Sequence, residues 1–234
     1  NEMGYETGLY PSSPYYAVKV PVFSFEKLSD VDTQLGPEMK STGEVLGIAG
    51  TMEEALYKGM IAAGYYMKRN GGILISVRDT DKKDLKELAK AYVSMGFTIY
   101  ATEGTARKLN SAGISSTIVK KPKEADEGEE TTISVMEKGR ISYVLSTSVT
   151  GRQPDRDSVR LRRKAVELGI PCLTSLDTAA VLALSLESKY DEDNVELIDI
   201  AHIVHGAADQ DEARQIKNAD DIHIPGYVLQ GHAD

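Results

Sequence analysis

A regular alternation between short apolar runs and amphipathic stretches, from Gly71 to Ser188, constrains this sequence most strongly. The apolar runs, which are typical of buried strands, are GGILISV, FTIY, STIV, ISYVLS and PCLTS. The segments between them place apolar residues at helical spacing. In DKKDLKELAKAYVSMG the predicted stripe consists of Leu85, Leu88, Ala89, Tyr92 and Val93. Strands that alternate with helices predict an α/β fold with a doubly wound, mostly parallel sheet.

The segment before this alternation differs in character. Residues 1–50 hold half of the chain's eight prolines and one alternating run, YYAVKVPVF, which predicts a strand that Pro21 restricts to a sheet edge. The stretch TMEEALYKGMIAAGYYMK then predicts a helix capped by Thr51, with Glu54 three residues on. One strand, a loop and one helix make no self-sufficient core, so we interpret this segment as a piece of something larger.

Composition excludes several classes of protein. A length of 234 residues, with 41% hydrophobic and 27% charged residues, is that of one large or two modest globular domains. The net charge of -9 argues against nucleic-acid and anionic-membrane partners, which require a basic face. Cys172 is the single cysteine, so no intramolecular disulfide forms. Without an apolar run of about 18 residues, we expect a soluble, cytoplasmic protein.

The final stretch, 189–234, has weaker periodicity and contains all four histidines: His202, His205, His223 and His232. His202 and His205 are three residues apart, a spacing that suits two metal ligands on one helix face. No cysteine lies nearby and the HExxH pattern is absent. We therefore expect a solvated tail rather than a metal site.

Polar residues follow every predicted strand of the sheet, where ligands bind to folds of this class. They are Ser76 to Lys82 after the first strand, Thr102 to Thr105 after the second, Lys120 and Lys121 after the third, Ser146 to Ser148 after the fourth, and Thr174 and Ser175 after the fifth. Gly104 allows close backbone approach, Thr105 opens a helix whose free N–H groups favour an anion, and Lys82 and Lys121 supply positive charge. The pattern predicts a site for a phosphorylated small molecule.

A purely structural interpretation competes with this one. Serine and threonine are common helix caps, and lysines near helix starts are usually solvated. Glu103 would repel a phosphate unless its carboxylate points away. No histidine occurs between residues 71 and 188, and Cys172 has no histidine partner, so we expect a structural thiol and a binding site rather than a catalytic one.

Two parts of the sequence are similar to the large subunit of carbamoyl phosphate synthetase. YYAVKVPVFSFEKL followed by LGPEMKSTGEVLG resembles the end of its second ATP-grasp unit. SVRDTDK, YATEGT and the cluster after YVLS resemble its C-terminal allosteric domain, which has the methylglyoxal-synthase-like fold. The resemblance covers about Tyr15 to Ser188. It implies an ATP-grasp remnant at 1–70, an allosteric domain at 71–188 and a tail of unassigned role at 189–234.

The resembling enzyme is an ATP-dependent ligase that makes carbamoyl phosphate from bicarbonate and glutamine-derived ammonia, for pyrimidine and arginine synthesis. It uses ATP with Mg or Mn and works with a glutaminase small subunit. The Asn-Pro-Arg stretch that accompanies the metal-binding carboxylates of an ATP-grasp site is absent from this sequence. We therefore expect a C-terminal fragment of the large subunit that binds an effector but has no catalytic residues, metal or cofactor of its own.

The resemblance implies a nucleotide effector such as UMP or IMP, held through its phosphate. The positions that match the family's site are Ser76, Lys82, Thr102, Thr105, Lys121, Ser146, Thr147 and Ser148. The last three replace the family's Asn-Thr-Thr, so the hydroxyls are kept and the amide is lost.

A second site of the family binds ornithine between the two domains. It uses a glutamate and a tyrosine where this sequence has Val20 and Cys172, and only Thr174 is kept. The chain also has no tryptophan, which the N-acetylglutamate-dependent branch places in its effector pocket. We expect control by UMP, with phosphoribosyl pyrophosphate as a further effector, rather than by ornithine.

Two alternatives remain open. A methylglyoxal synthase, a lyase of the same fold, would carry Gly-Pro-Met-Gly-Gly-Asp where this chain has STSVTGRQPDRD. The acids there are Asp155 and Asp157, and Asp157 is better explained as a helix N-cap. The other alternative is a domain that binds no ligand and serves only self-association in a homo-oligomer.

Overall fold

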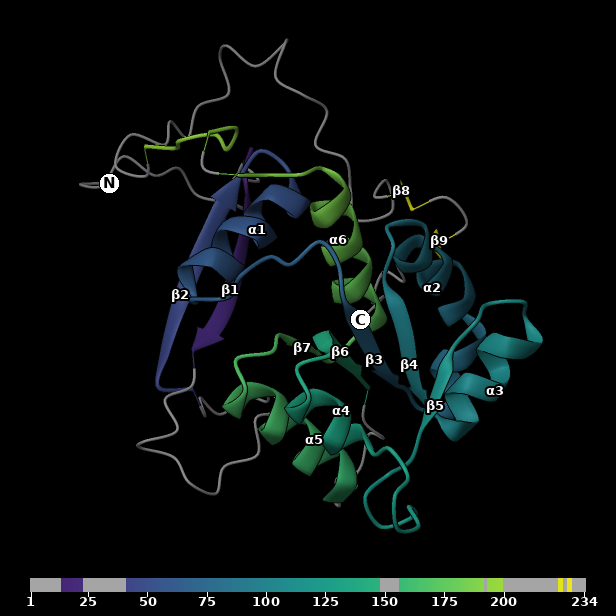
Figure 1. Ribbon diagram of the computed structural model, residues 1–234. Helices are drawn as coiled ribbons and strands as arrows, with labels where there is room; N and C mark the ends of the chain where they lie inside the picture. Colours follow the sequence, from purple (N-terminus) through teal and green to yellow (C-terminus); the bar gives the residue numbers. More distant parts are fainter. Residues whose placement is uncertain are drawn as a thin grey trace, which may run out of the picture.

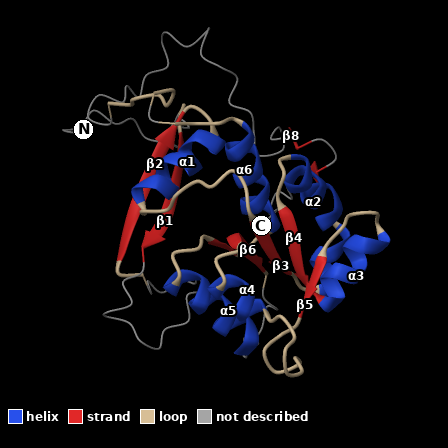
Figure 2. Cartoon of the chain, viewed as in Figure 1, coloured by secondary structure: helices blue, strands red, loops and turns tan. Residues whose placement is uncertain are grey.

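The computed structural model describes residues 14–22, 41–147, 156–191 and 193–199, together with two short strands at 223–224 and 227–228. Its central element is a five-stranded sheet in which every neighbouring pair is parallel (Figures 1 and 2). In the order β5-β4-β3-β6-β7, the strands are Thr117–Val119, Thr98–Thr102, Gly72–Ser76, Ile141–Ser146 and Cys172–Leu173. The predicted α/β fold with a doubly wound parallel sheet is confirmed.

Helices cover both faces of this sheet. One face carries α2 (Leu85–Ser94), α3 (Glu103–Ser111) and α6 (Leu176–Glu187), and the other carries α4 (Thr132–Glu137) and α5 (Arg156–Glu167), which lie below the sheet in Figure 1. Side chains alternate accordingly along β3: Ile73 and Ile75 join the core on the first face, and Leu74 joins the core on the second. Two apolar cores therefore sandwich one buried sheet.

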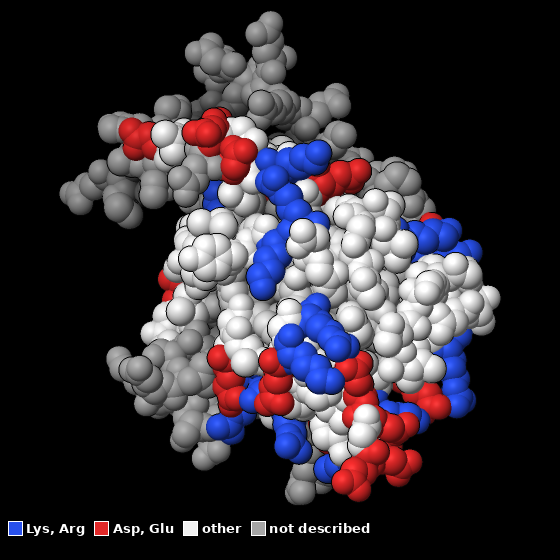
Figure 3. All heavy atoms as spheres, in the orientation of Figure 1, with Lys and Arg blue, Asp and Glu red and all other residues white. Residues whose placement is uncertain are grey.

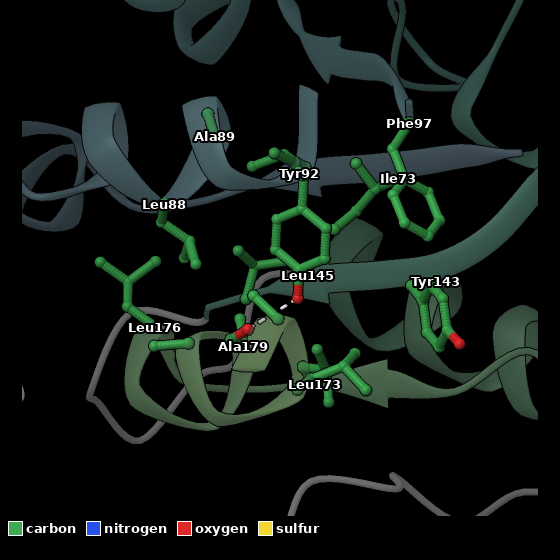
Figure 4. Close-up of a cluster of buried hydrophobic side chains, with 14 of the residues drawn as sticks. Ile73, Leu88, Ala89, Tyr92, Phe97, Tyr143, Leu145, Leu173, Leu176 and Ala179 are labelled. Atoms are coloured by element: carbon green, nitrogen blue, oxygen red, sulfur yellow. Dashed lines mark hydrogen bonds between the residues drawn. The ribbon is translucent and has the colours of Figure 1, made fainter. Parts of the chain in front are cut away.

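The larger core contains a fully buried tyrosine. Figure 4 shows Tyr92 of α2 pointing toward α6, where its hydroxyl donates a hydrogen bond to the carbonyl of Ala179 at 2.6 Å. Its ring meets Phe97 edge-on, and Phe97 in turn meets Tyr143 of β6. Burial holds the pKa of Tyr92 well above its ordinary value, so this group remains a neutral donor. This hydrogen bond links α2 to α6, and both helices cover the same face of the sheet.

The strand order places a topological switch point beside β3. From β3 the chain moves outward to β4 and β5 on one side, and then returns to β6 and β7 on the other. Connections that leave two adjacent strands in opposite directions open a crevice at the carboxyl ends of those strands. The strand order therefore favours a ligand site at the carboxyl ends of β3 and β6.

A smaller unit precedes the sheet. It consists of β1 (Tyr16–Val22), paired antiparallel with β2 (Gly43–Ala49), and of α1 (Met52–Ala62), which packs against both strands and against α6. Thr51 caps α1 as predicted, because its hydroxyl accepts from the Glu54 amide at 3.4 Å. The predicted strand around Pro21 is also confirmed, and among the described residues it pairs only with β2, as expected of an edge.

Two expectations for this unit were wrong. β2 was not predicted, because glycines at positions 43 and 47 weaken the strand pattern of GEVLGIA. The helix predicted through residue 68 ends at Ala62, and Gly64 follows with a φ of 86°. Gly47 is needed for packing, since a Cβ there would lie 2.0 Å from the Ala55 carbonyl oxygen and 2.5 Å from the Gly59 nitrogen. Strand and helix touch through their backbones at this point.

The described segment after α6 returns to the smaller unit and contacts α1, and we call residues 190–191 and 193–196 the clasp. The ring of Tyr190 packs on Tyr57 at 5.8 Å, and its hydroxyl lies 3.3 Å from the Thr51 hydroxyl. Farther along, the Glu196 amide donates to the Glu54 carboxylate at 2.7 Å, and Lys58 donates to the Glu196 carbonyl. The clasp thus ties the sheet domain to the smaller unit.

Little of the remaining tail falls within the described residues. β8 (His223–Ile224) pairs antiparallel with β9 (Tyr227–Val228), whereas His202, His205 and His232 lie outside the described part of the chain. Within that part, no helix combines the length and apolarity needed to cross a membrane.

The contact between β2 and α1 gives a first prediction. Gly47→Ala should lower the free energy of unfolding by about 1–3 kcal/mol, because the added methyl group forces two backbones apart. Gly43→Ala is the matched control in the same strand, since among the described residues its Cβ would meet only the Val22 Cβ at 4.0 Å. Urea unfolding of the three proteins measures the difference. Equal losses for both variants would contradict the packing described here.

Candidate functional site

Three hydroxyl residues form a row across the carboxyl ends of adjacent strands. Ser76 of β3 is paired with Ser146 of β6, and the β3–β4 register that joins Ile75 to Ala101 brings Thr102 to the other side of Ser76. Because side chains alternate along each strand, all three lie on the face covered by α4 and α5. The row crosses the switch point of the sheet.

Ser146 is the most unusual member of the row. Its side chain has 0% exposure, and its hydroxyl has no hydrogen-bond partner among the described residues. A buried hydroxyl without a partner is costly and rare in proteins. The neighbouring Thr147 is also buried, but its hydroxyl accepts from the Arg78 amide at 3.0 Å and so bridges the loops that follow β6 and β3. Ser146 therefore has an open hydrogen-bonding capacity beside this bridge.

Asp81 organises the loop after β3, in the short 3-10 helix η1 (Asp79–Lys83). Its carboxylate accepts from Arg78 Nε at 2.7 Å and from the Thr80 hydroxyl at 3.1 Å, and also from Thr147. Partial burial acts to raise the pKa of Asp81, but the bonds from Arg78, Thr147 and Thr80 outweigh it and leave the pKa lowered. Sequence reasoning missed this role, because the partners come from two strand ends.

Lys82 extends from the same loop to the start of α3. A Cβ on Gly104 would lie 2.8 Å from Lys82 Nζ, so the ammonium group rests against the glycine at the N-terminal end of the helix. The ammonium also forms an ion pair with the Asp79 carboxylate at 2.6 Å, whose side chain is 94% exposed. Hydrogen bonding to Lys82 and its charge lower the pKa of Asp79. Within the described ranges, the carboxylate that pairs with Lys82 is thus exposed and easily displaced.

The first turn of α3 contributes two hydroxyls. Thr102 occupies the N-cap position but makes no capping bond to the helix, so the first amides of α3 lack the usual side-chain acceptor. Its hydroxyl instead donates weakly to that of Thr105 at 3.4 Å, and Thr105 is buried. Uncapped amides at a helix start are a common binding element for anions.

Glu103 does not oppose an anion at this position. Its carboxylate accepts from Arg107 at 2.5 Å and lies 3.5 Å from Lys120 Nζ, so two cations neutralise it. Hydrogen bonding and charge from Arg107, together with the charge of Lys120, lower the pKa of Glu103. The structure thus brings Lys120 to the start of α3, whereas the predicted Lys121 lies one residue farther on and pairs with Glu124 at 3.9 Å.

The remaining predicted residues fall in three places. Ser148 and Asp155 lie outside the described residues. Asp157 lies in the first turn of α5, which begins at Arg156, and contacts Lys123 at 3.5 Å, so the predicted N-cap role was wrong. Thr174 lies away from the hydroxyl row, in a separate cavity that it shares with Val20 and Cys172.

The charges of the described surface are mixed in sign. In Figure 3, basic and acidic side chains alternate over the lower part of the molecule, where α4, α5 and the loop after β5 lie in Figure 1. Within the described ranges, no group of three or more histidine, cysteine, aspartate or glutamate side chains is arranged to hold a metal ion. The positive charge that matters for the site is local and comes from Lys82 and Lys120.

Residues 84–174 match the family model of the MGS-like domain. The chain contains an MGS-like domain. The match runs from the start of α2 to the residue after β7 and so includes Thr102, Thr105, Ser146 and Thr147. The MGS-like family includes both allosteric regulatory domains and methylglyoxal synthase. A regulatory function and a catalytic function are therefore both candidates for this domain.

The hydrogen bonds of Asp81 predict a pH dependence. Its pKa is lowered in the folded protein, so the stability that it contributes is present above the unfolded value of about 3.9 and is lost as the pH falls through the folded value. We expect the free energy of unfolding to fall more steeply between about pH 5 and pH 2 for the wild type than for Asp81→Asn. Urea unfolding at a series of pH values gives both slopes, and identical slopes would contradict this role.

Proposed function

We propose that the MGS-like domain binds a phosphorylated small-molecule effector at the carboxyl ends of β3, β4 and β6. We further propose that the chain is the regulatory part of a carbamoyl phosphate synthetase large subunit, with UMP as the effector and IMP or phosphoribosyl pyrophosphate as further candidates. In this proposal the phosphate lies between Lys82, the first turn of α3 and the hydroxyl row.

The placement of Lys82 carries the proposal. A helix N-terminus is the positive end of the helix dipole, so a cation beside it is unfavourable unless an anion lies between the two. Lys82 Nζ nevertheless rests against Gly104 in the first turn of α3, beside amides that Thr102 does not cap. A phosphate group satisfies the ammonium and the amides together and can replace the exposed Asp79 carboxylate.

The hydroxyls around this point suit the same ligand. Thr105 and Thr102 lie at the helix start, and Ser146 offers a buried hydroxyl without a described partner. Phosphate oxygens accept several hydrogen bonds at once, and a bond to a charged group contributes about 1.5–3 kcal/mol. Lys120, which its contact with Glu103 holds near the start of α3, adds positive charge. The chain's overall negative charge therefore does not prevent local anion binding.

The regulatory part of the proposal depends on the smaller unit. Effector binding acts on a distant active site only through a coupling free energy between them. The unit formed by β1, β2 and α1 contacts α6 and is held by the clasp, so it is suited to transmit a change from the sheet domain. In the proposed assembly, the ATP- and Mg- or Mn-dependent chemistry belongs to the rest of the large subunit, and the glutaminase small subunit supplies ammonia.

The alternative activity, methylglyoxal synthase, requires a carboxylate that accepts a substrate proton. Asp81 is poorly suited to that task, because its carboxylate already accepts hydrogen bonds from Arg78, Thr80 and Thr147 and its pKa is lowered. Asp79 is exposed and paired with Lys82. Among the described acids of this edge, these two therefore favour the organisation of a binding loop over catalysis.

The first functional prediction concerns Lys82 and Thr105. Lys82→Ala should weaken UMP binding and reduce its dependence on salt, because one phosphate-facing charge is lost. Thr105→Ala should weaken binding by about 1.5–3 kcal/mol, and Thr105→Ser, which keeps the hydroxyl, should restore most of the affinity. Isothermal titration calorimetry of this chain with UMP, IMP, phosphoribosyl pyrophosphate and ornithine provides the measurement.

Lys83→Ala is the matched control for Lys82→Ala. Lys83 is the adjacent residue, but its side chain is 74% exposed and lies 3.9 Å from Asp84. Its removal should leave the dissociation constant unchanged. If none of the phosphorylated compounds binds the wild-type chain, the effector proposal fails and the self-association alternative gains support.

The second functional prediction separates regulation from lyase activity. Incubation of the chain with dihydroxyacetone phosphate should release no methylglyoxal above the uncatalysed rate, because Asp81 is held by hydrogen bonds that lower its pKa and Asp79 is exposed to solvent. A colorimetric assay for methylglyoxal makes the measurement. Product formation that Asp81→Asn or Asp79→Asn abolishes would replace the regulatory proposal with the enzymatic one.

A further inference from the structure

A groove runs between α2 and α6, on the opposite face of the sheet from the hydroxyl row. Its volume is about 240 Å³. Ala91 and Ser94 of α2 and Ala183 of α6 line it, and their short side chains leave the space between the two helices open. A groove between two helices is a common docking site for another segment of polypeptide.

The floor of this groove is apolar and its polar groups are engaged. Met95 and Leu184 line the groove and are half-buried, because they pack against the larger core. At the rim, Lys90 donates to the Glu87 carboxylate at 2.8 Å, and the Ser94 hydroxyl donates to a backbone carbonyl of its own helix at 2.8 Å. This lining suits an apolar segment of polypeptide better than a charged small molecule.

The C-terminal part of the chain lies next to this groove. Strand β8 contacts α2, and Figure 1 shows β8 and β9 beside that helix. The two strands pair antiparallel, with Ile224 opposite Tyr227. The structure therefore brings a hairpin of the tail to one of the two helices that form the groove.

The sequence of this hairpin requires an apolar surface to pack on. Ile222, Ile224, Tyr227, Val228 and Leu229 make the stretch IHIPGYVL apolar, whereas the preceding stretch, AADQDEARQIKNADD, is mostly polar. A Pro-Gly dipeptide separates the two strands, as is typical of a turn. An isolated two-stranded hairpin is only marginally stable in water, so burial of its apolar side chains has to come from contact with another element.

We propose that the groove between α2 and α6 is the docking site of the chain's own hairpin, β8–β9. The segment 200–222, which is 222 − 199 = 23 residues long, connects Asp199 to β8. An extended chain of that length spans roughly 75 Å, so the tail can reach from the clasp on α1 to α2. A tether of this kind gives the hairpin an effective concentration of roughly millimolar at the groove, which favours docking within one chain over docking between two copies.

The docked hairpin would attach the tail at both of its ends. The clasp contacts α1 of the smaller unit, and the hairpin would cover α2 and α6 of the sheet domain. The tail thereby covers apolar surface that would otherwise be available to a second copy or to another protein. Docking is independent of the phosphorylated effector, because Lys82 and Thr105 do not line this groove.

Disulfide trapping in the full chain tests where the hairpin docks. In a Cys172→Ser background, which removes the single native thiol, Ser94→Cys is combined with His223→Cys and the dilute protein is oxidised mildly. The matched control combines His223→Cys with Leu168→Cys, because Leu168 is 41% exposed and follows α5 on the other face of the sheet. The Ser94 pair should link within one chain at least about tenfold faster than the control pair. Equal rates, or linkage only between two chains, would overturn the proposal.

Hydrogen exchange followed by mass spectrometry tests the groove itself. Ser94→Arg places a long charged side chain in the groove, so the amides of β8 and β9 should exchange at least about tenfold faster than in the wild type. Val93→Arg is the matched control, since Val93 is the adjacent residue and is 44% exposed but does not line the groove. It should leave the exchange of the hairpin unchanged. The same exchange in wild type and Ser94→Arg, or equal acceleration by both variants, would refute docking in this groove.

Discussion

The pairing of β3 with β6 is the constraint on which the rest of the sheet domain depends. It joins Gly72–Ser76 to Ile141–Ser146 in parallel, and this requires close approach at its start. A Cβ on Gly72 would lie 2.6 Å from the Arg140 carbonyl oxygen and 2.8 Å from the Tyr100 ring. Once the strands are aligned, Ser76 meets Ser146 and the Arg78 amide reaches Thr147. The candidate site is thus a consequence of strand register.

The charges at the candidate site are balanced locally, although the chain is acidic overall. The site keeps its cations close to carboxylates that are either exposed, as Asp79 is, or held by other partners, as Glu103 is by Arg107. In the proposed site this arrangement does not block an anion, because an exposed ion pair contributes little to stability and is easily exchanged. Binding can then replace one partner of Lys82 with another rather than build the pocket anew.

The order and type of the sheet domain's elements could be predicted because their periodicity is local. β2 could not, since its glycines are explained only by the backbone contact with α1. For the candidate site, the hydroxyls and lysines at the strand ends predict a binding region, and this stays a prediction. The hydrogen bonds of Asp81 and the neutralisation of Glu103 could not be predicted, because they depend on side chains from separate segments. The position of Lys82 over Gly104 is likewise a tertiary fact that no spacing encodes.

Besides the packing of α1 against α6, two segments join the units: the chain between α1 and β3, and the clasp on α1. Arg69 in the first link donates to the Tyr190 carbonyl in the second at 2.7 Å, so the links are themselves connected. A unit attached at a single point can rotate about that point, and a second attachment restricts this rotation. Together with the packing of α1 on α6, the two links therefore restrict relative rotation of the units. Any change in the width of the cavity around Val20 and Cys172 would therefore require both links and the α1–α6 contact to shift together.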